Sequence, residues 1–400
     1  MIHSQYDVIV VGAGPSGSAA ARAVAQAGLH VLCIEEHATI GYPIQCAGLL
    51  SNNAFAECNV TDASLLHSVS GATIVAGMQS FSFDAKKTKA VIVDRGLMDR
   101  EMAMDAATDG ADFLPKSYVS AINPARKTIT AQGPEGVMEI GYRVLIAADG
   151  PRSGIARQLD IERAPMYLSG VQCEILWDDD PEKVTIYPNA SPDFFAWVIP
   201  IGDGRARVGL CGLTDVKERF SRFYSMIADK SNTNSMHQFV AGTIPIGIMP
   251  KTYGQGVMFV GDAAGFAKPT SGGGVYTGVR SARHAAATAI EACEQDSSSD
   301  TVLKRYEERW NSDFGKELRF GMRCMNVRRQ ISPQDLEQIV QIMNTPKIAD
   351  IIVKYGDMDR PQEVISRLML QPGMYQCLLP CMKAGIKSLI PFRKSSHLYD

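Results

Sequence analysis

Three glycines near the start of the chain have the spacing that holds a dinucleotide pyrophosphate. Gly12, Gly14 and Gly17 follow directly after the apolar segment 6–11. In this pattern the first glycine permits a tight turn, the second lets the backbone approach the phosphates, and the third lets the following helix pack against the strand. The alanine-rich segment that ends near Gly28 is the expected helix, and its free N–H groups and positive dipole end bind anionic phosphates.

An acidic residue ends the next predicted strand. The apolar segment 30–34 stops at Glu35, at roughly the 20-residue distance from the first glycine that is expected for a ribose-binding acid. A carboxylate there can accept hydrogen bonds from both ribose hydroxyls. Strand, glycine turn, helix, second strand and acid together predict a dinucleotide-binding unit with these cofactor contacts: Gly12, Gly14, Pro15, Ser16, Gly17 and Glu35.

A strand far downstream indicates which dinucleotide is bound. The apolar segment 257–260 runs into Gly261 and Asp262, and a glycine run precedes a predicted helix that begins near Val275. This pairing resembles the second half of the FAD fingerprint in the glutathione-reductase-like superfamily, where such an Asp holds the ribityl chain. The resemblance implies FAD, with a helix dipole that stabilises anionic reduced flavin, and these contacts: Asp262, Gly272, Gly273, Gly274 and Val275.

Two segments between these anchors match the same group of proteins. A DGxxSxxxR element runs from Asp149 to Arg157, and an RxxxD pattern runs from Arg95 to Asp99. Both are similar to elements of flavoproteins that resemble para-hydroxybenzoate hydroxylase. The resemblance places Arg95 near the flavin and Val119 near the adenine, whereas Asp149 and Arg157 brace the domain.

The remaining segments must build the substrate side. The chain has 400 residues, of which 46% are hydrophobic and 21% charged, as is typical of a globular protein with two or three packed units. Alternating apolar residues predict an antiparallel sheet, and apolar residues three and four apart after residue 297 predict helices. We expect an α/β protein with a Rossmann-like, discontinuous FAD-binding domain (1–65, 94–163 and 245–296), an inserted β-sheet substrate domain (66–93 and 164–244) and a C-terminal helical region (297–400).

An aromatic run between two prolines lies in this predicted sheet, in a strand closed by the segment 200–204. The run resembles the PxxYxWxFP motif of the geranylgeranyl reductase family, flavoenzymes that saturate isoprenoid chains of archaeal lipids, chlorophyll precursors and quinones. Phe195 replaces the Tyr and Ile199 replaces the Phe, so no phenol is present there to donate a proton. Flavin-dependent halogenases carry WxWxIP, and the run alone leaves both families open. The expected substrate contacts are Pro192, Phe195, Trp197 and Pro200.

The loop after Glu35 favours the reductases. They carry a similar Pro-x-x-Cys-Gly/Ala loop, matched here from Pro43 to Gly48, in which the Cys lies on the reactive face of the flavin. The resemblance makes Cys46, Ala47 and Gly48 flavin contacts and Cys46 the candidate catalytic residue. Halogenases are expected instead to carry a Lys further on, and three lysines keep that alternative open: Lys86, Lys87 and Lys89.

These motifs predict an FAD-dependent oxidoreductase that acts on CH–CH bonds. The expected substrate is a geranylgeranyl group of a membrane lipid or prenyl precursor, which receives hydride from N5 of reduced flavin together with a proton. The proton donor is Cys46 or a bound water, since none of the seven histidines stands in a catalytic motif. One alternative is a flavin monooxygenase or halogenase that acts on an aromatic substrate, and another is a non-enzymatic flavin redox sensor.

The expected partners follow from composition. No second GxGxxG unit is present, so the electron donor is expected to be a carrier such as ferredoxin, or NAD(P)H that docks transiently. The net charge of −3 gives no reason to expect nucleic acid. The nine cysteines lack metal-ligand spacing, which predicts reduced thiols, no metal and a cytoplasmic protein. The apolar and basic segment 382–394 suggests peripheral contact with an anionic membrane.

Overall fold

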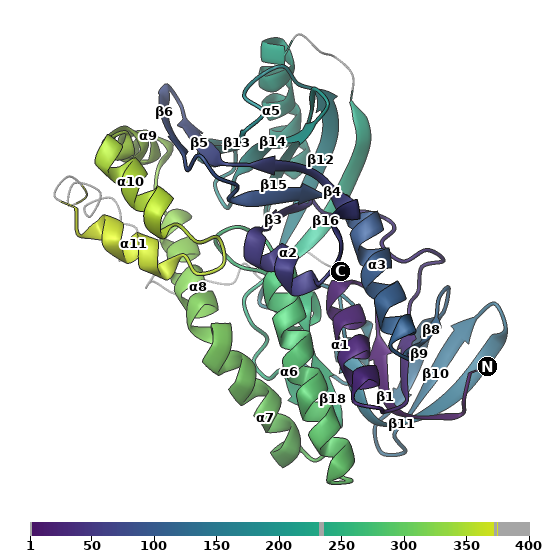
Figure 1. Cartoon of the computed structure of the whole chain (residues 1–400). Helices are drawn as coiled ribbons and strands as arrows, with labels where there is room; N and C mark the ends of the chain where they lie inside the picture. Colours follow the sequence, from purple (N-terminus) through teal and green to yellow (C-terminus); the bar gives the residue numbers. More distant parts are fainter. Residues whose placement is uncertain (1, 232–235, 372–373, 375–400) are drawn as a thin grey trace.

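The structure is a computed structural model that describes residues 2–231, 236–371 and 374. A nucleotide-binding sheet, a second sheet and a group of C-terminal helices occupy three regions of the molecule (Figure 1). The predicted α/β class is confirmed, whereas the domain boundaries stay a prediction. No helix within the described part of the chain combines the length and the apolar character needed to cross a bilayer.

The first glycine motif belongs to an eight-stranded sheet whose parallel core has the order β8-β2-β1-β11-β18. Its central strands β1, β2 and β18 are almost entirely buried and apolar. The strands are β1 (Gln5–Val11), β2 (Val31–Ile34), β8 (Asp112–Leu114), β9 (Tyr118–Asn123), β10 (Thr128–Gly133), β11 (Gly136–Ala147), β17 (Tyr253–Gly254) and β18 (Val257–Phe259). The associated helices are α1 (Pro15–Gln26), α3 (Arg95–Thr108), α4 (Gly154–Gln158) and α6 (Val275–Glu294).

The second sheet has seven strands in the order β16-β12-β15-β14-β13-β5-β6. Helix α5 (Val216–Ser231) covers one face, where its aromatic residues pack on Val208 and Leu210. The other face turns toward the flavin-side loops and the C-terminal helices. The strands are β5 (Gly71–Ala76), β6 (Gln79–Asp84), β12 (Met166–Leu176), β13 (Lys183–Tyr187), β14 (Ala196–Gly202), β15 (Arg205–Gly212) and β16 (His237–Ile246).

One sequence expectation about this sheet is wrong. The sheet is mixed rather than antiparallel, because β13 pairs with β5 in parallel. The chain between these strands passes through the nucleotide-binding domain, and such a crossover connection, unlike a hairpin, permits parallel pairing. Strand β14 ends at Gly202, within the segment 200–204 that was expected to close it, and its register shifts after Pro200, an irregularity that accommodates the missing N–H.

A small third sheet connects the two larger ones. It consists of β3 (Leu49–Ser51), β7 (Ala90–Val93) and β4 (Leu65–Val69). Along the chain, α2 (Asn52–Cys58) and a short 3-10 turn, Asp62–Ser64, connect β3 to β4. Strands β4 and β7 therefore pair outside the seven-stranded sheet, although both lie in the segment expected to build it. This arrangement places the loop that carries Cys46 between the two larger sheets.

The C-terminal helices pack on both domains (Figure 1). Helix α7 and the π-helical segment Asn311–Gly315 bury Tyr306, Trp310 and Phe314 against the nucleotide-binding core. Further along, Leu336, Val340 and Ile348 cover β5 and β6. The helices are α7 (Asp300–Trp310), α8 (Lys316–Arg328), α9 (Pro333–Met343), α10 (Pro346–Tyr355) and α11 (Gln362–Met369).

Candidate active site

The glycine turn at the carboxyl end of β1 leaves open space where a phosphate is expected. Gly12 has φ +98° and Gly17 lies directly over it, so that a Cβ on Gly17 would overlap the carbonyl oxygen of Gly12. A Cβ on Gly14, by contrast, would meet no atom within 4 Å. Gly14 caps α1, with Pro15 in the first turn. Two glycines are thus required by packing, while the third borders free space at a helix N-terminus, as a pyrophosphate requires.

Glu35 is placed at the end of β2, beside this turn. Its Oε2 accepts a hydrogen bond from the Ala13 N–H at 2.8 Å, and its Oε1 accepts one from the His37 N–H at 2.9 Å. The carboxylate therefore holds the glycine turn in place, a role that the sequence did not indicate. Val119 lies nearby on β9, half-buried against the nucleotide-binding core. The ribose contact of Glu35 and the adenine contact of Val119 stay predictions.

Asp262 lies at the end of β18, on the 3-10 turn Gly261–Ala264. A Cβ on Gly274 would come within 2.7 Å of its Oδ1, so the glycine run after residue 271 closes over this carboxylate. Burial raises the pKa of Asp262 to about 6, against an opposing effect of Arg95. Within the described residues no hydrogen-bond donor reaches the carboxylate, which leaves it available for a hydroxyl-bearing ligand.

The two nucleotide-binding motifs meet at Ser16. Its hydroxyl lies against both Gly261 and Gly278, where a Cβ on either glycine would overlap the Ser16 Oγ. Helix α1, the Asp262 turn and α6 therefore pack closely, with the small Ser16 side chain between them. Because the carboxyl ends of parallel strands share one edge of a sheet, the predicted pyrophosphate and ribityl contacts lie along one line.

Arg95 lies at the start of α3 and forms a bidentate ion pair with Asp99, with both nitrogen–oxygen distances at 2.9 Å. Burial alone would lower the pKa of Arg95, but Asp99 and the neighbouring Cys46 raise it. Arg95 also lies close enough to Asp262 to lower the pKa of that carboxyl. A single guanidinium thus joins three motifs that are far apart in the sequence.

The Cys46 loop is held by the second sheet. Gln172 on β12 donates to the Cys46 carbonyl at 2.9 Å, and Arg207 on β15 donates to the Ala47 carbonyl at 2.9 Å. The Gly48 N–H faces the Cys46 Sγ at 3.4 Å. Gly48 has φ +70°, and a Cβ there would approach an Arg207 nitrogen and the Val93 carbonyl oxygen to 2.5 Å. The loop therefore fits only a glycine at residue 48.

Sequence reasoning missed the residues that hold this loop. Arg207 and Glu174 form a buried ion pair, with Arg207 Nε at 3.1 Å from Glu174 Oε1. Both stand on the face of the seven-stranded sheet that also carries Gln172 and Trp197. The sequence did contain a signal for them, because both are charged residues at strand positions where the alternation predicts apolar residues.

Aromatic residues line the same face of the sheet. Phe194 stacks on Phe195 with ring centroids 4.2 Å apart, and Phe195 meets Trp197 edge-on at 6.2 Å. The indole lies over Gly209, where a Cβ would overlap it. The Trp197 Nε1 is buried without a hydrogen-bond partner among the described residues. We call Phe194, Phe195 and Trp197 the aromatic wall.

Two predicted substrate contacts lie apart from the aromatic wall. Pro192 is exposed. Pro200 has the same parity along β14 as Ala196 and Val198, which pack beneath α5, and therefore belongs to the opposite face. Phe194, which was not predicted, is 5% exposed and reaches the glycine run, since a Cβ on Gly272 would lie 3.4 Å from its ring.

Helix α8 fixes the segment that precedes the aromatic wall. Arg328 donates to the backbone carbonyls of Pro188, Ser191 and Phe194. Burial lowers the pKa of Arg328 to about 10, so that it stays charged at neutral pH. Arg329, the residue directly after α8, pairs with Asp193 at 3.2 Å.

Comparison with known proteins agrees with this geometry. Residues 5–316 match the family model described as FAD binding domain. The chain is 31% identical over 369 residues to digeranylgeranylglycerophospholipid reductase 2 of Methanothermobacter thermautotrophicus, covering 87% of this chain and 94% of the relative. It is 32% identical over 364 residues to digeranylgeranylglycerophospholipid reductase 1 of Methanopyrus kandleri, covering 85% and 94%. The chain belongs to the geranylgeranyl reductase family of FAD-binding proteins.

Solved structures extend the comparison. A geranylgeranyl bacteriochlorophyll reductase-like protein of Thermoplasma acidophilum superposes with a TM-score of 0.81 at 25% identity, covering 91% of this chain and 98% of that one. A flavin-dependent brominase superposes with a TM-score of 0.70 at 15% identity, covering 96% and 98%, which shows the fold alone. This family member is therefore an FAD-dependent oxidoreductase.

The residues present fit FAD. The free space at Gly14 borders a helix N-terminus, and the Asp262 carboxylate has no donor among the described residues. Arg95 and the N-terminus of α6 add positive charge at the flavin end. These residues would hold the phosphates, the ribityl chain and the ring, respectively, although each individual contact stays a prediction.

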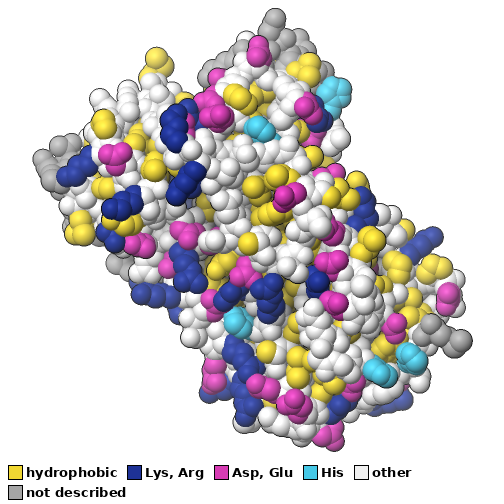
Figure 2. Space-filling model, in the orientation of Figure 1, with side chains coloured by type: hydrophobic (Ala, Val, Ile, Leu, Met, Phe, Trp, Pro, Cys, Tyr) yellow, Lys and Arg dark blue, Asp and Glu magenta, His cyan; other side chains and the backbone are white. Residues whose placement is uncertain are grey.

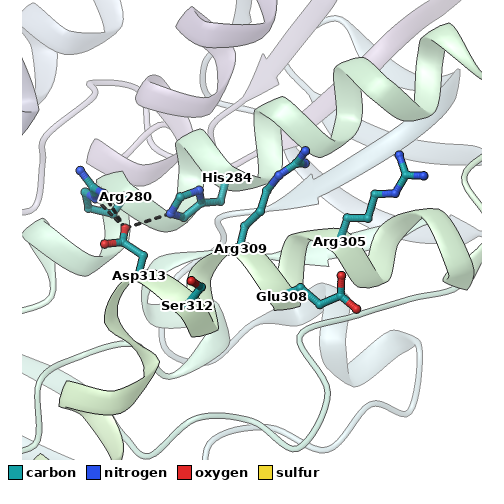
Figure 3. Close-up of a pocket in the computed structure, with 7 residues that line it drawn as sticks. All are labelled: Arg280, His284, Arg305, Glu308, Arg309, Ser312 and Asp313. Atoms are coloured by element: carbon teal, nitrogen blue, oxygen red, sulfur yellow. Dashed lines mark hydrogen bonds and ion pairs between the residues drawn. The ribbon is translucent and has the colours of Figure 1, made fainter.

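Two surface hollows are lined by other residues. One of ≈ 680 Å³ is lined by residues of α6, α7 and the π-helical segment: Arg280, His284, Arg305, Glu308, Arg309, Ser312 and Asp313 (Figure 3). Asp313 accepts hydrogen bonds from Arg280 and His284. Charges of both signs alternate over this region (Figure 2). So polar a hollow does not suit a lipid, and an apolar tunnel at the aromatic wall stays a prediction.

The raised pKa of Asp262 predicts that the free energy of unfolding of the apoprotein depends on pH. The folded-state pKa is about 6 against an ordinary value of 3.8, so ionisation destabilises the fold as pH rises through this window. Replacing Asp262→Asn should stabilise the apoprotein by about 3 kcal/mol above pH 7, at about 1.4 kcal/mol per pKa unit, and by only about 0.5 kcal/mol at pH 4. Urea unfolding of both proteins across this range measures the difference, and a pH-independent difference would contradict the assignment.

Proposed function

We propose that this family member reduces geranylgeranyl double bonds of a membrane lipid or prenyl precursor. The observation that supports this most is the aromatic wall, which continues into an apolar cluster that contacts the glycine run at Gly272. The cluster also contains Leu168, Ile244, Ile246, Met322 and Met325. An apolar surface beside the flavin-side turn suits a polyprenyl chain, and the names of the M. thermautotrophicus and M. kandleri relatives describe reductases of such lipids.

The substrate sets the requirements on the protein. An isolated trisubstituted alkene has no carbonyl to accept electron density, so its reduction needs a proton and a hydride delivered together in a dry pocket. FAD, once reduced, supplies the hydride from N5. The aromatic wall excludes water and binds the chain, at about 0.8 kcal/mol for each buried methylene.

Cys46 is the proposed proton donor, directly or through a bound water. Its thiol lies between the Gly48 N–H and Arg95, and its backbone is fixed by Gln172. Phe195 stands where the family motif has a Tyr and has no hydroxyl to offer.

Anaerobic turnover tests the function. Dithionite-reduced protein is incubated with geranylgeranyl lipid, and the product is analysed by mass spectrometry. We expect a gain of two mass units for each saturated bond. No mass gain, together with oxygen use that depends on an aromatic substrate, would favour a monooxygenase or halogenase instead. No turnover with either substrate would favour a redox sensor.

Substitutions at Cys46 and Trp197 test where the reaction occurs. Cys46→Ala should slow saturation by about 100-fold or more if the thiol delivers the proton, and Trp197→Ala should slow it by at least about tenfold through lost packing. Both should keep FAD bound. Val198→Ala is the matched control, because this neighbour on β14 faces α5 and should leave the rate unchanged. Unchanged saturation in both variants would show that the pocket lies elsewhere.

We also propose that electrons come from a carrier such as ferredoxin, or from NAD(P)H. Anaerobic bleaching of the FAD absorbance by each donor in turn identifies which one acts, and bleaching by neither would contradict both. Peripheral membrane contact is proposed through segment 382–394, which lies outside the described residues. Cosedimentation with anionic liposomes tests it, and equal binding by protein truncated after residue 381 would exclude it.

A further inference from the structure

A buried ion pair joins the flavin-side glycine run to the C-terminal helices. The Lys268 Nζ lies 2.6 Å from the Asp359 Oδ1, and the two side chains are 9% and 1% exposed. Asp359 belongs to the connection between α10 and α11. Burying such a pair removes two charges from water, so it is a weak source of stability. A buried lysine at this place therefore calls for another role.

The partners of the pair leave one donor free. The Lys268 Nζ also donates to the Met358 carbonyl at 3.0 Å, and the Ser51 hydroxyl donates to the Asp359 Oδ2 at 2.5 Å. Asp359 is thus held from both sides. An ammonium has three N–H donors, and the third has no partner among the described residues.

The backbone of Lys268 organises the turn that precedes α6. Its carbonyl accepts hydrogen bonds from the Ser271 N–H at 3.2 Å and the Gly272 N–H at 2.8 Å, and its own N–H donates to the Gly273 carbonyl at 3.1 Å. A Cβ on Gly273 would lie 3.7 Å from the Lys268 Nζ. The ammonium therefore lies directly beside the glycine run.

The Lys268 ammonium and the positive end of the α6 dipole both lie at this turn. Helix α6 begins immediately after the glycine run, so its free N–H groups and dipole face the same space as the Lys268 ammonium. The Asp262 carboxylate lies on the other side, beneath Gly274. When FAD takes up two electrons and one proton, the product carries one additional negative charge. The Lys268 ammonium and the N-terminus of α6 would stabilise this charge.

We propose that Lys268 is an electrostatic positioning residue that favours the anionic reduced form of bound FAD, and that Asp359 both holds it and moderates its charge. The proposal needs bound FAD, which family membership provides. It rests on the proposed function only in that the cofactor must be reduced, and its test needs no lipid. A failed test would therefore leave lipid reduction open, and absent lipid turnover would leave this proposal intact.

The test is the midpoint potential of bound FAD, measured anaerobically by dye equilibration. Lys268→Met should make reduction at least about tenfold less favourable, which is about 30 mV more negative for a two-electron couple. Lys268→Arg retains the charge and should stay close to the unmodified protein. Asp359→Asn removes the moderating charge and should shift the potential in the positive direction.

The double variant Lys268→Met/Asp359→Asn completes the series. It lacks both charges and should have a potential between those of Lys268→Met and the unmodified protein. If Lys268→Met alone does not fold, the double variant and Asp359→Asn still lie on opposite sides of the unmodified protein. A purely structural pair would weaken FAD binding in every variant without this order, and equal potentials or shifts in one direction would overturn the proposal.

Discussion

Gly17→Ala is expected to produce a protein that neither retains FAD nor folds stably. The added Cβ would overlap the Gly12 carbonyl oxygen, which is backbone inside the nucleotide-binding turn and has no room to move. Overpacking of this kind costs about 3 kcal/mol or more. Thermal unfolding of the apoprotein, followed by circular dichroism, measures the loss.

Gly14→Ala is the matched control. Gly14 has φ −66° and open space around its Cβ position, so the apoprotein should stay within about 0.5 kcal/mol of the unmodified protein. FAD affinity should nevertheless fall by about tenfold or more, because the new methyl group occupies the space expected for the pyrophosphate. Fluorescence titration with FAD measures this. Equal stability of the two apoproteins would show that the turn is not packed as described.

Arg207→Met has the second large expected effect, a loss of about 3 to 5 kcal/mol, because Glu174 would remain buried and charged with the exposed, more distant Arg205 as its remaining ion-pair partner among the described residues. The same change frees the carbonyls of Ala47 and Val93, so the Cys46 loop should loosen. Denaturant unfolding gives the stability, and the visible spectrum of bound FAD reports on the loop.

Arg205→Met is the control that tests whether the stability loss comes from the burial of the ion pair or from the removal of any positive charge near Glu174. Arg205 reaches the same glutamate at 3.8 Å, but its side chain is 43% exposed, so its loss should cost less than about 1 kcal/mol. The flavin spectrum should not change. If both arginine variants lost the same stability, the buried pair would not be what anchors the loop.

The sequence predicted best those features that arise from short, local patterns. The glycine turn at Gly12 and the acid at Glu35 depend on one strand, one turn and one helix, each of which has its own periodicity. The observed bonds of Glu35 to Ala13 and His37 show why the acid follows β2 directly. The FAD-binding fold followed from such motifs in their order along the chain.

The remaining features depend on contacts between distant segments. Gln172 and Arg207 lie on different strands more than a hundred residues after Cys46, and only the fold brings them to its loop. The face to which Pro200 belongs depends on strand alternation, which a motif comparison does not include. The role of α8 in holding Phe194 through Arg328 depends on helix packing that no local pattern encodes.

The parallel pairing of β13 with β5 also determines an order of events during synthesis. The hairpin of β5 and β6 leaves the ribosome before residues 85–182, whereas the strand that covers its edge comes after them. At translation rates of about 5 to 20 residues per second, that edge stays without its partner for roughly 5 to 20 s. An unpaired strand edge can form hydrogen bonds with other chains, so the nascent protein is most prone to aggregate in this interval.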